Sequence, residues 1–154
     1  MCAIVSMHGG PTAVARRALL DTGFVVALVN ASDPDHERCL DVWRELHVQL
    51  VSVEGVLVEA AHMLRRTAGG IDAIVGIVFG AGTELVPTSD ERAARAVALM
   101  AKYADVPMDF VDALLVVIAE ERAIQDVLTL DRRGFDVYRI GRKRFRRLPA
   151  GARA

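Results

Sequence analysis

The sequence predicts an α/β protein with a central, mostly parallel sheet. Short apolar segments with β-branched residues recur along the chain, and each is followed by a longer segment whose apolar residues recur at helical spacing. The length of 154 residues suits one domain with one core. Strands that alternate with helices pair in parallel, because each helix carries the chain back to the same edge of the sheet.

The expected elements follow one another in that alternating order. Strands are expected at 18–20, 48–53, 83–88 and 126–130, with 135–140 as a possible edge strand. Helices are expected at 22–30, after Pro34, and at 56–66, 71–80, 90–105 and 108–123. The last of these helices is apolar nearly all round, which is typical of a buried helix.

Charge is distributed unevenly. Residues 1–138 hold all 20 acidic residues and 12 of the 19 basic ones, whereas residues 139–154 hold seven basic residues and no acid. A basic strip beside an acidic body is suited to a polyanion such as nucleic acid, although such tails are as often merely solvated. The sequence divides into a flexible extension over 1–16, a domain over 17–141 and a basic tail over 142–154.

Several classes of protein are excluded by what the sequence lacks. No apolar segment approaches the roughly 20 residues of a membrane-spanning helix, and the first residues do not resemble a secretion signal, so we expect a cytoplasmic protein without membrane association. Cys2 and Cys39 show no metal-binding spacing. A nucleophile elbow, a Cys-His signature and a phosphate-binding loop of the Walker type are also missing.

Four acidic residues stand out by position. Asp21 and Asp131 directly follow apolar strands, where the carboxyl ends of parallel strands form ligand sites. Glu59 and Asp112 lie in apolar helices, where a lone ionised carboxylate is costly. A shared hard cation would explain all four, and oxygen ligands suit Mg²⁺ or Mn²⁺. Such a site suits hydrolysis of a phosphodiester, but an acid after a strand is also a common helix cap.

Four segments in this order resemble the signature blocks of PIN domains, specifically of VapC-type toxins. They are LLDTGFVVALVNASDPDHERC, VLVEAAHMLRR, YADVPMDFVDALLVVIAEE and LTLDRRGFDVYR. The resemblance covers residues 18–140 and implies a PIN-like α/β/α sandwich. It also implies Mg²⁺-dependent endoribonuclease activity, an RNA substrate, a small cognate antitoxin and a homodimer.

The resemblance assigns the family's acids to Asp21, Glu59, Asp112 and Asp131 as catalytic and metal-binding residues. Thr22 and Thr129 match small polar positions beside the site. Asp109 is a candidate for supporting or replacing a ligand, although a helix cap explains it equally well. The candidates for RNA binding are Arg132, Arg133, Arg142, Lys143 and Arg144.

One departure from the family pattern keeps a second interpretation open. Gly134 stands where many relatives carry a further Asp, which puts a second metal position in doubt. The alternative is a catalytically weak PIN-like module that binds RNA or antitoxin. A third class, a small-molecule phosphatase, is disfavoured by the basic tail. The pair formed by Glu59 and His62 resembles half of a di-iron motif, but such sites need a second copy.

Overall fold

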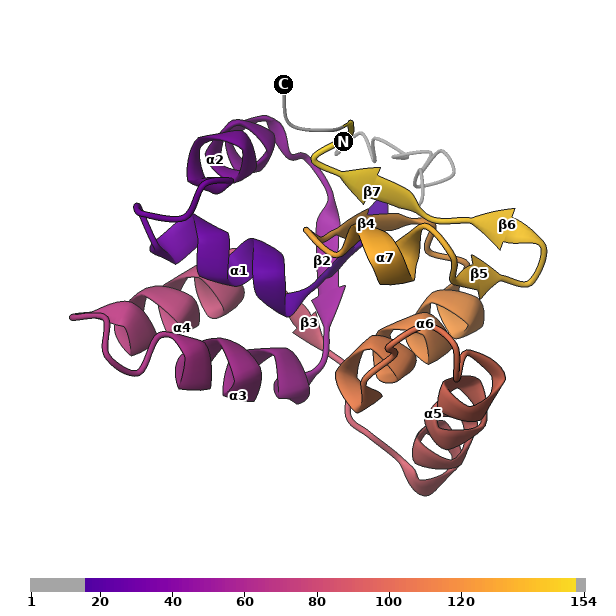
Figure 1. Ribbon diagram of the computed structural model, residues 1–154. Helices are drawn as coiled ribbons and strands as arrows, with labels where there is room; N and C mark the ends of the chain where they lie inside the picture. The colour runs from indigo at the N-terminus through magenta and orange to yellow at the C-terminus, as the bar shows by residue number, and fades with distance from the viewer. Residues whose placement is uncertain (1–15, 152–154) are drawn as a thin grey trace, which may run out of the picture.

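Five parallel strands form the centre of the computed structural model, which describes residues 16–151. Their order in the sheet is β3 (Glu84–Leu85), β2 (Gln49–Ser52), β1 (Arg17–Leu20), β4 (Asp126–Leu128) and β7 (Arg146–Leu148) (Figure 1). The predicted α/β class with a mostly parallel sheet is therefore confirmed. The predicted extension over 1–16 lies outside the described residues except for Arg16.

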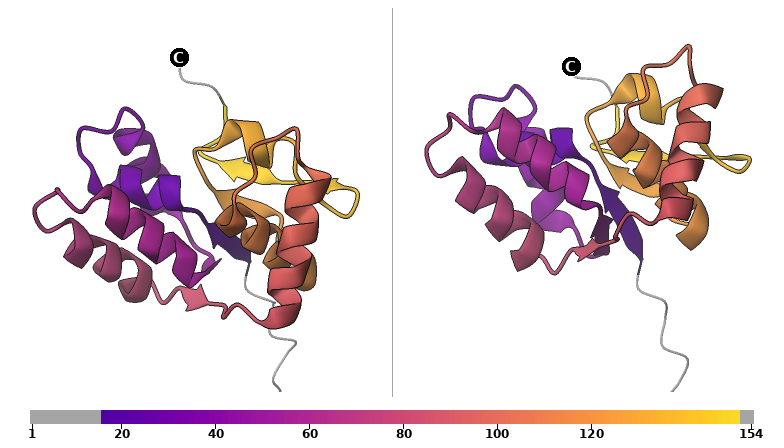
Figure 2. Two further views of the ribbon diagram at one scale, coloured as in Figure 1. Left: turned by 60° about the horizontal axis from the view of Figure 1, so that its bottom comes forward. Right: turned by 90° about the horizontal axis from the view of Figure 1, so that it is seen from below.

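Two groups of helices cover the sheet. One group contains α1 (Thr22–Val29), α2 (His36–Glu45), α3 (Glu54–Met63) and α4 (Gly70–Gly80). The other contains α5 (Asp90–Lys102) and α6 (Phe110–Arg122), with the short helix α7 (Arg132–Phe135) beside β4. Figure 2 shows the two groups on either side of the strands. Within residues 16–151, no helix is long and apolar enough to cross a membrane.

Helix α6 is deeply buried, as its apolar sequence predicts. All residues from Val111 to Ala119 are buried, Asp112 among them. The helix begins at Asp109, whose side chain accepts a hydrogen bond from the Asp112 N–H at 2.8 Å, and it ends at Ala123, which has a left-handed conformation. The cap fixes the start of the helix, and with it the depth of Asp112 in the core.

Three of the predicted strands are wrong in extent. The strand expected at 126–130 ends at Leu128, so Asp131 caps α7 rather than directly following the strand. The strand expected at 83–88 contains only Glu84 and Leu85 in the structure, since Pro87 has no N–H to donate to a neighbouring strand. The strand expected at 135–140 begins only at Arg139, because Phe135 is the last residue of α7. Arg139 and Ile140 form β5, which pairs antiparallel with β6 (Lys143–Arg144) in a separate two-stranded sheet.

The basic segment expected as a tail over 142–154 contributes two strands, β6 and β7. A buried carboxylate holds β7 against β4: Asp126 accepts hydrogen bonds from Nε of Arg146 at 2.5 Å and from Nε of Arg16 at 2.6 Å. Burial alone would raise the pKa of Asp126, but these two hydrogen bonds outweigh it and hold the pKa below its usual range. Arg146 therefore has a structural role.

The role of β7 can be tested by truncation. A chain that ends after Arg144 lacks β7 and leaves Asp126 buried without one of its two partners, so we expect it to lose its cooperative thermal transition. A chain that ends after Gly151 keeps the strand and should melt as the full chain does. Circular dichroism during heating distinguishes the two, and a native-like transition in the shorter chain would contradict a structural role for β7.

Candidate metal centre

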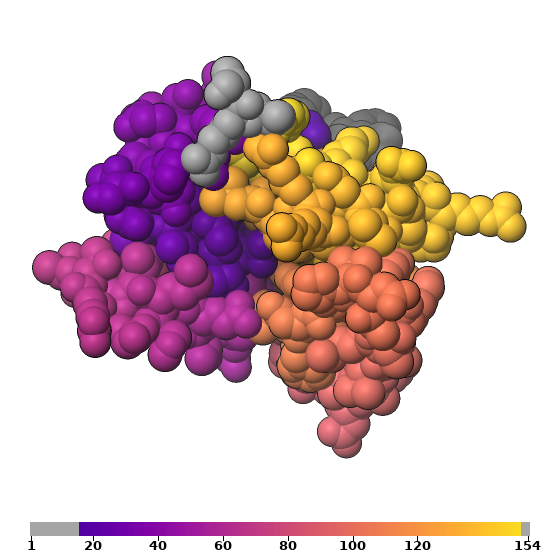
Figure 3. Space-filling model, viewed as in Figure 1, coloured from indigo at the N-terminus to yellow at the C-terminus, as the bar shows by residue number. Residues whose placement is uncertain are grey.

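A cleft of about 330 Å³ opens where β1 and β4 end, and it contains all four predicted acids. Leu20 of β1 pairs with Leu128 of β4, so the chain leaves both strands at the same edge of the sheet. Figure 3 shows the molecule hollowed between the side formed by α1 and α3 and the side formed by α6 and α7. The lining residues are Asp21, Thr22, Gly23, Glu59, Met63, Pro107, Asp109, Asp112, Asp131 and Arg133.

Asp21 is buried at the junction of β1 and α1. One carboxylate oxygen, Oδ1, accepts a hydrogen bond from the Thr22 N–H at 2.8 Å, which caps α1. The other oxygen, Oδ2, accepts one from the Thr129 hydroxyl at 2.6 Å. Burial nevertheless raises the pKa of Asp21 to about 6, because these hydrogen bonds recover only part of the solvation that the carboxylate loses.

Asp112 is the most perturbed acid in the cleft. Its carboxylate is buried in the first turn of α6, and a hydrogen bond from the Asp109 backbone offsets only a small part of the lost solvation. Burial raises the pKa of Asp112 to about 8, and the negative charges of Asp21, Asp109 and Asp131 add to the effect. The carboxylate thus lacks a positive partner, which a bound cation would supply.

Glu59 and Asp131 are each held by their own partner. Glu59 accepts a hydrogen bond from the Thr22 hydroxyl at 2.7 Å. Asp131 caps α7, where Oδ1 accepts from the N–H groups of Arg133 at 3.0 Å and Gly134 at 3.1 Å.

The four acids share the cleft without being arranged as a finished metal site. Among residues 16–151, no group of three or more His, Cys, Asp or Glu side chains is placed so that it could hold a metal ion together. The hydrogen bonds from Thr22, Thr129 and the backbone of α7 direct three of the carboxylates individually. Their oxygens must turn toward one another before they can share a cation.

The structure explains why position 134 is a glycine, which the sequence alone does not reveal. A Cβ atom added at this position would collide with the Asp131 carboxylate and would lie 2.6 Å from Cε2 of Tyr138. The Tyr138 ring is fully buried and packs edge-on against Tyr103 and Phe135, so it cannot move aside easily. The space that an Asp at 134 would need is therefore filled.

The other candidates from the sequence fall into two groups. Asp109 lines the cleft and caps α6, so both of its predicted roles are compatible with the structure. Arg133 lines the cleft, whereas Arg142, in the turn between β5 and β6, and Lys143 and Arg144, on β6, are not among its lining residues. Met63 was missed, although it stands four residues after Glu59 and so on the same face of α3.

A larger hollow of about 760 Å³ lies between α2, β2 and α4. It is lined by apolar and small residues, including Trp43, Leu46 and Ile77, and contains no acidic residue. Its chemistry suits an apolar surface of a partner rather than a cation.

The fold and the cleft define an α/β protein with buried acids at the carboxyl edge of a parallel sheet. The chain belongs to the PIN domain family, which it matches over residues 18–141. It is 30% identical to Ribonuclease VapC26 of Mycobacterium tuberculosis over 138 residues, which are 85% of this chain and 99% of that protein.

Two solved structures share the fold. VapC20 of Mycobacterium tuberculosis, a toxin that cleaves the sarcin-ricin loop, superposes with a TM-score of 0.69 at 22% identity, over 75% of this chain and 90% of that one. A toxin-antitoxin complex from Klebsiella pneumoniae superposes with a TM-score of 0.60 at 16% identity, over 78% and 91% of the two chains. The resemblance to VapC toxins predicted from the sequence is confirmed.

The raised pKa of Asp112 predicts how stability depends on pH. Because the folded-state pKa of about 8 exceeds the unfolded value of about 4, stability without metal is lost as the pH rises from 4 through 8. Each tenfold change in proton affinity corresponds to about 1.4 kcal/mol. Asp112→Asn removes the ionisable group, so it should stabilise the metal-free protein by a few kcal/mol at pH 8 and by little at pH 4.

Urea unfolding in EDTA at the two pH values measures this difference. Asp72→Asn, which changes an exposed acid on α4, serves as the control and should be neutral at both. A gain for Asp112→Asn that is equal at pH 4 and pH 8 would contradict the assignment of the raised pKa to this carboxyl.

Because the space around Gly134 is filled, adding a single methyl group there should lower the stability of the fold considerably. Gly134→Ala should destabilise the protein by about 2 kcal/mol or more, since the new methyl meets a carboxylate and a buried ring. Gly76→Ala is the matched control, because its new methyl meets nothing within 4 Å in α4 and should stabilise the helix by up to about 1 kcal/mol. Chemical denaturation of both variants tests the pair; equal effects would refute the steric argument.

Proposed function

We propose that the protein is a metal-dependent endoribonuclease, the toxin component of a toxin-antitoxin system that acts in the cytoplasm. The observation that carries the proposal is the gathering of Asp21, Glu59, Asp112 and Asp131 in one cleft at the carboxyl edge of the sheet. The identity to a protein named as a ribonuclease, over nearly the whole length of both chains, supports the same activity.

The donors in the cleft fit a hard divalent cation, and we propose Mg²⁺, with Mn²⁺ as the substitute. Asp21, Asp112, Asp131 and Glu59 would hold the ion, and all of them offer carboxylate oxygens. When bound, such an ion neutralises the scissile phosphate and lowers the pKa of a water molecule. The two acids whose pKa values burial raises, Asp21 and Asp112, would gain most from the positive charge.

The neighbouring polar residues would position these acids and the RNA. The Thr129 hydroxyl orients the Asp21 carboxylate, and the Thr22 hydroxyl orients Glu59. Asp109 holds the first turn of α6 and so the depth of Asp112. Arg133 at the wall of the cleft would bind an RNA phosphate next to the one that is cut, and Arg132 beside it would bind another.

We also propose an antitoxin and a second copy of the chain as partners. Large apolar side chains are exposed along α3 and α4, namely Val58, Met63, Ile71, Val75 and Phe79. Other residues of α4, Ala73, Gly76 and Ile77, line the apolar hollow between α2 and α4. Exposed apolar surface of this kind is typical of interfaces. The Klebsiella pneumoniae structure with the same fold is itself a complex of toxin and antitoxin.

One observation favours the alternative, a catalytically weak module that binds RNA or antitoxin. The carboxylates are held apart by individual hydrogen bonds, and they form no group ready to hold a metal in the described part of the chain. If the acids do not turn toward a cation, RNA can bind without being cut. Metal titration and RNA cleavage must therefore both be measured.

The decisive experiment is cleavage of a mixed cellular RNA pool by the purified, antitoxin-free chain in Mg²⁺ and in EDTA. We expect discrete fragments in Mg²⁺ only, and a loss of at least 100-fold in rate for Asp21→Asn, which removes one charge from the site. Asp72→Asn on exposed α4 is the matched control and should cut as the original chain does. Mapping the 5′ ends of the fragments identifies the cut sequence.

The outcomes separate the two proposals. Fragments that appear in EDTA, or that Asp21→Asn produces at full rate, would remove the metal-dependent mechanism. RNA binding without cleavage in both Mg²⁺ and Mn²⁺ would favour the binding module.

A further inference from the structure

A basic hairpin stands out from the body of the molecule. It comprises residues 139–144: β5, the turn at Gly141 and Arg142, and β6. Figure 1 shows it projecting on the side away from α1–α4, and Figure 3 shows its tip clear of the surrounding surface. The match to the PIN domain family ends at residue 141, so half of the hairpin and the whole of β7 follow the family's common core.

The basic residues in and around the hairpin divide into two kinds. Arg139 donates hydrogen bonds to the carbonyls of Asp136 and Tyr138, Arg146 pairs with Asp126, and Arg147 pairs with Asp136. These three hold the hairpin and β7 to the body. The cations of Arg142, Lys143 and Arg144 are exposed and form no ion pair or side-chain hydrogen bond within residues 16–151.

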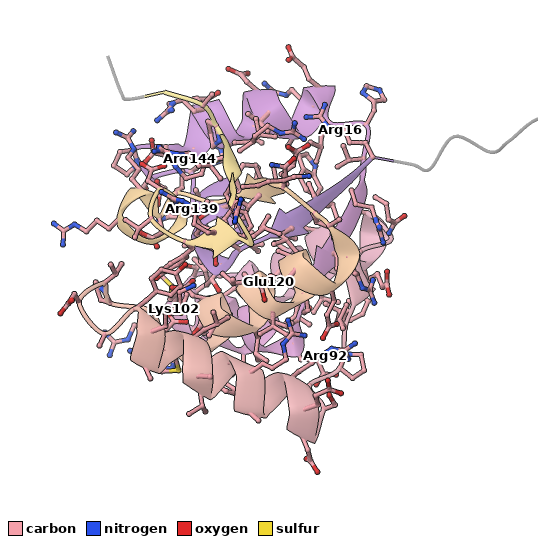
Figure 4. All side chains as sticks on the ribbon, turned by 90° about the vertical axis from the view of Figure 1, so that its right-hand side faces the viewer. Arg16, Arg92, Lys102, Glu120, Arg139 and Arg144 are labelled. Carbon is pink, nitrogen blue, oxygen red and sulfur yellow. The ribbon has the colours of Figure 1, made fainter. Side chains whose placement is uncertain are left out.

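The unpaired cations carry an electrostatic cost. Arg144 lies directly across the strand pair from Arg139, and like charges in that position repel. Figure 4 shows Arg139 and Arg144 close together on this face. Residues 139–154 contain no acid that could offset the repulsion. Since these charges do not stabilise the fold, an external anion is what would balance them.

The distance between the hairpin and the cleft sets a minimum length for an anion that contacts both. Gly141 and Lys143 line a hollow of about 370 Å³ with Glu120 and Ala123, near the C-terminal end of α6. Asp112 lies eight residues before Glu120 in the same helix, which corresponds to ~12 Å along the helix axis. A polyanion that reaches both sites must therefore extend at least this far beyond the cleft.

The chemistry of the hairpin suits the phosphate backbone rather than the bases. The hollow beneath it is lined by Glu120, Ala123, Gln125, Ile140, Gly141 and Lys143, with no aromatic ring on which a base could stack. Cations that contact phosphates bind without sequence preference, and they make affinity depend on salt.

We propose that the basic hairpin is a second RNA-binding surface, which holds the backbone of an RNA that continues past the acidic cleft. The choice of RNA as the polyanion rests on the proposed function. The protein then prefers long RNA over short oligonucleotides, and the hairpin contributes to affinity but not to the choice of the cut sequence.

The test compares two double variants of the full chain in the Asp112→Asn background, so that the RNA stays uncut. Arg142→Gln/Arg144→Gln removes two charges from the hairpin, and Arg44→Gln/Arg66→Gln removes two exposed arginines near α2 and α3, on the far side of the molecule. Binding of fluorescent 24-nucleotide and 4-nucleotide oligouridine is measured in Mg²⁺ between 50 and 300 mM salt. Thermal unfolding confirms that each variant is folded.

We expect the hairpin variant to bind the 24-nucleotide RNA about tenfold more weakly at low salt. The slope of log affinity against log salt should fall by about 1.4, because each phosphate contact on a single strand contributes about 0.7. Binding of the 4-nucleotide RNA, and both affinities of the control, should change less than twofold. Since the substitutions remove charges that repel one another, the melting temperature of the hairpin variant should not fall.

Three outcomes would overturn the proposal: an unchanged salt slope, an equal loss in the control, or an equal loss on both RNA lengths. A loss of antitoxin binding with RNA binding intact would assign the hairpin to a protein partner instead. The readout is binding of uncut RNA, so the hairpin can succeed or fail independently of whether the original chain cleaves RNA.

Discussion

The hydrogen bond from the Thr129 hydroxyl to the Asp21 carboxylate joins the ends of the two central strands, and the acidic cleft depends on this junction. It exists because β1 and β4 are neighbours in the sheet with Leu20 opposite Leu128. The same Thr129 oxygen accepts the Asp131 N–H at 3.0 Å, so one side chain orients one acid and fixes the backbone of another. A shift in the register of the two strands would break both contacts at once.

The cleft is built at the expense of stability. Asp112 is buried without a positive partner, and Asp21 is buried with hydrogen bonds that recover only part of its lost solvation. The apolar helix α6 and the sheet around it offset that cost through their burial. Functional sites with buried acids commonly show this pattern, in which the core stabilises the fold and the site destabilises it.

The parts of the structure that sequence could predict are those set by periodicity and by position along a strand. The alternation of strands and helices, the burial of α6 and the meeting of Asp21 with Asp131 all follow from such patterns. The entry of Arg146–Leu148 into the sheet could not be predicted, because it depends on contacts with distant residues such as Asp126. The metal-binding role of the four acids stays a prediction, since individual hydrogen bonds direct three of the carboxylates and the four do not form a ready metal site within residues 16–151.

The contact of Gly134 with Tyr138 constrains how this chain could change in evolution. A further acid at position 134 needs space that the carboxylate of Asp131 and the ring of Tyr138 now fill. Tyr138 in turn packs against Tyr103 and Phe135, so replacing it by a smaller residue would leave a cavity between α5 and α7. Neither single substitution is neutral, and the acid can be gained only when positions 134 and 138 change together. What keeps a further acid out of the cleft is therefore the packing around position 134, not the chemistry of the site.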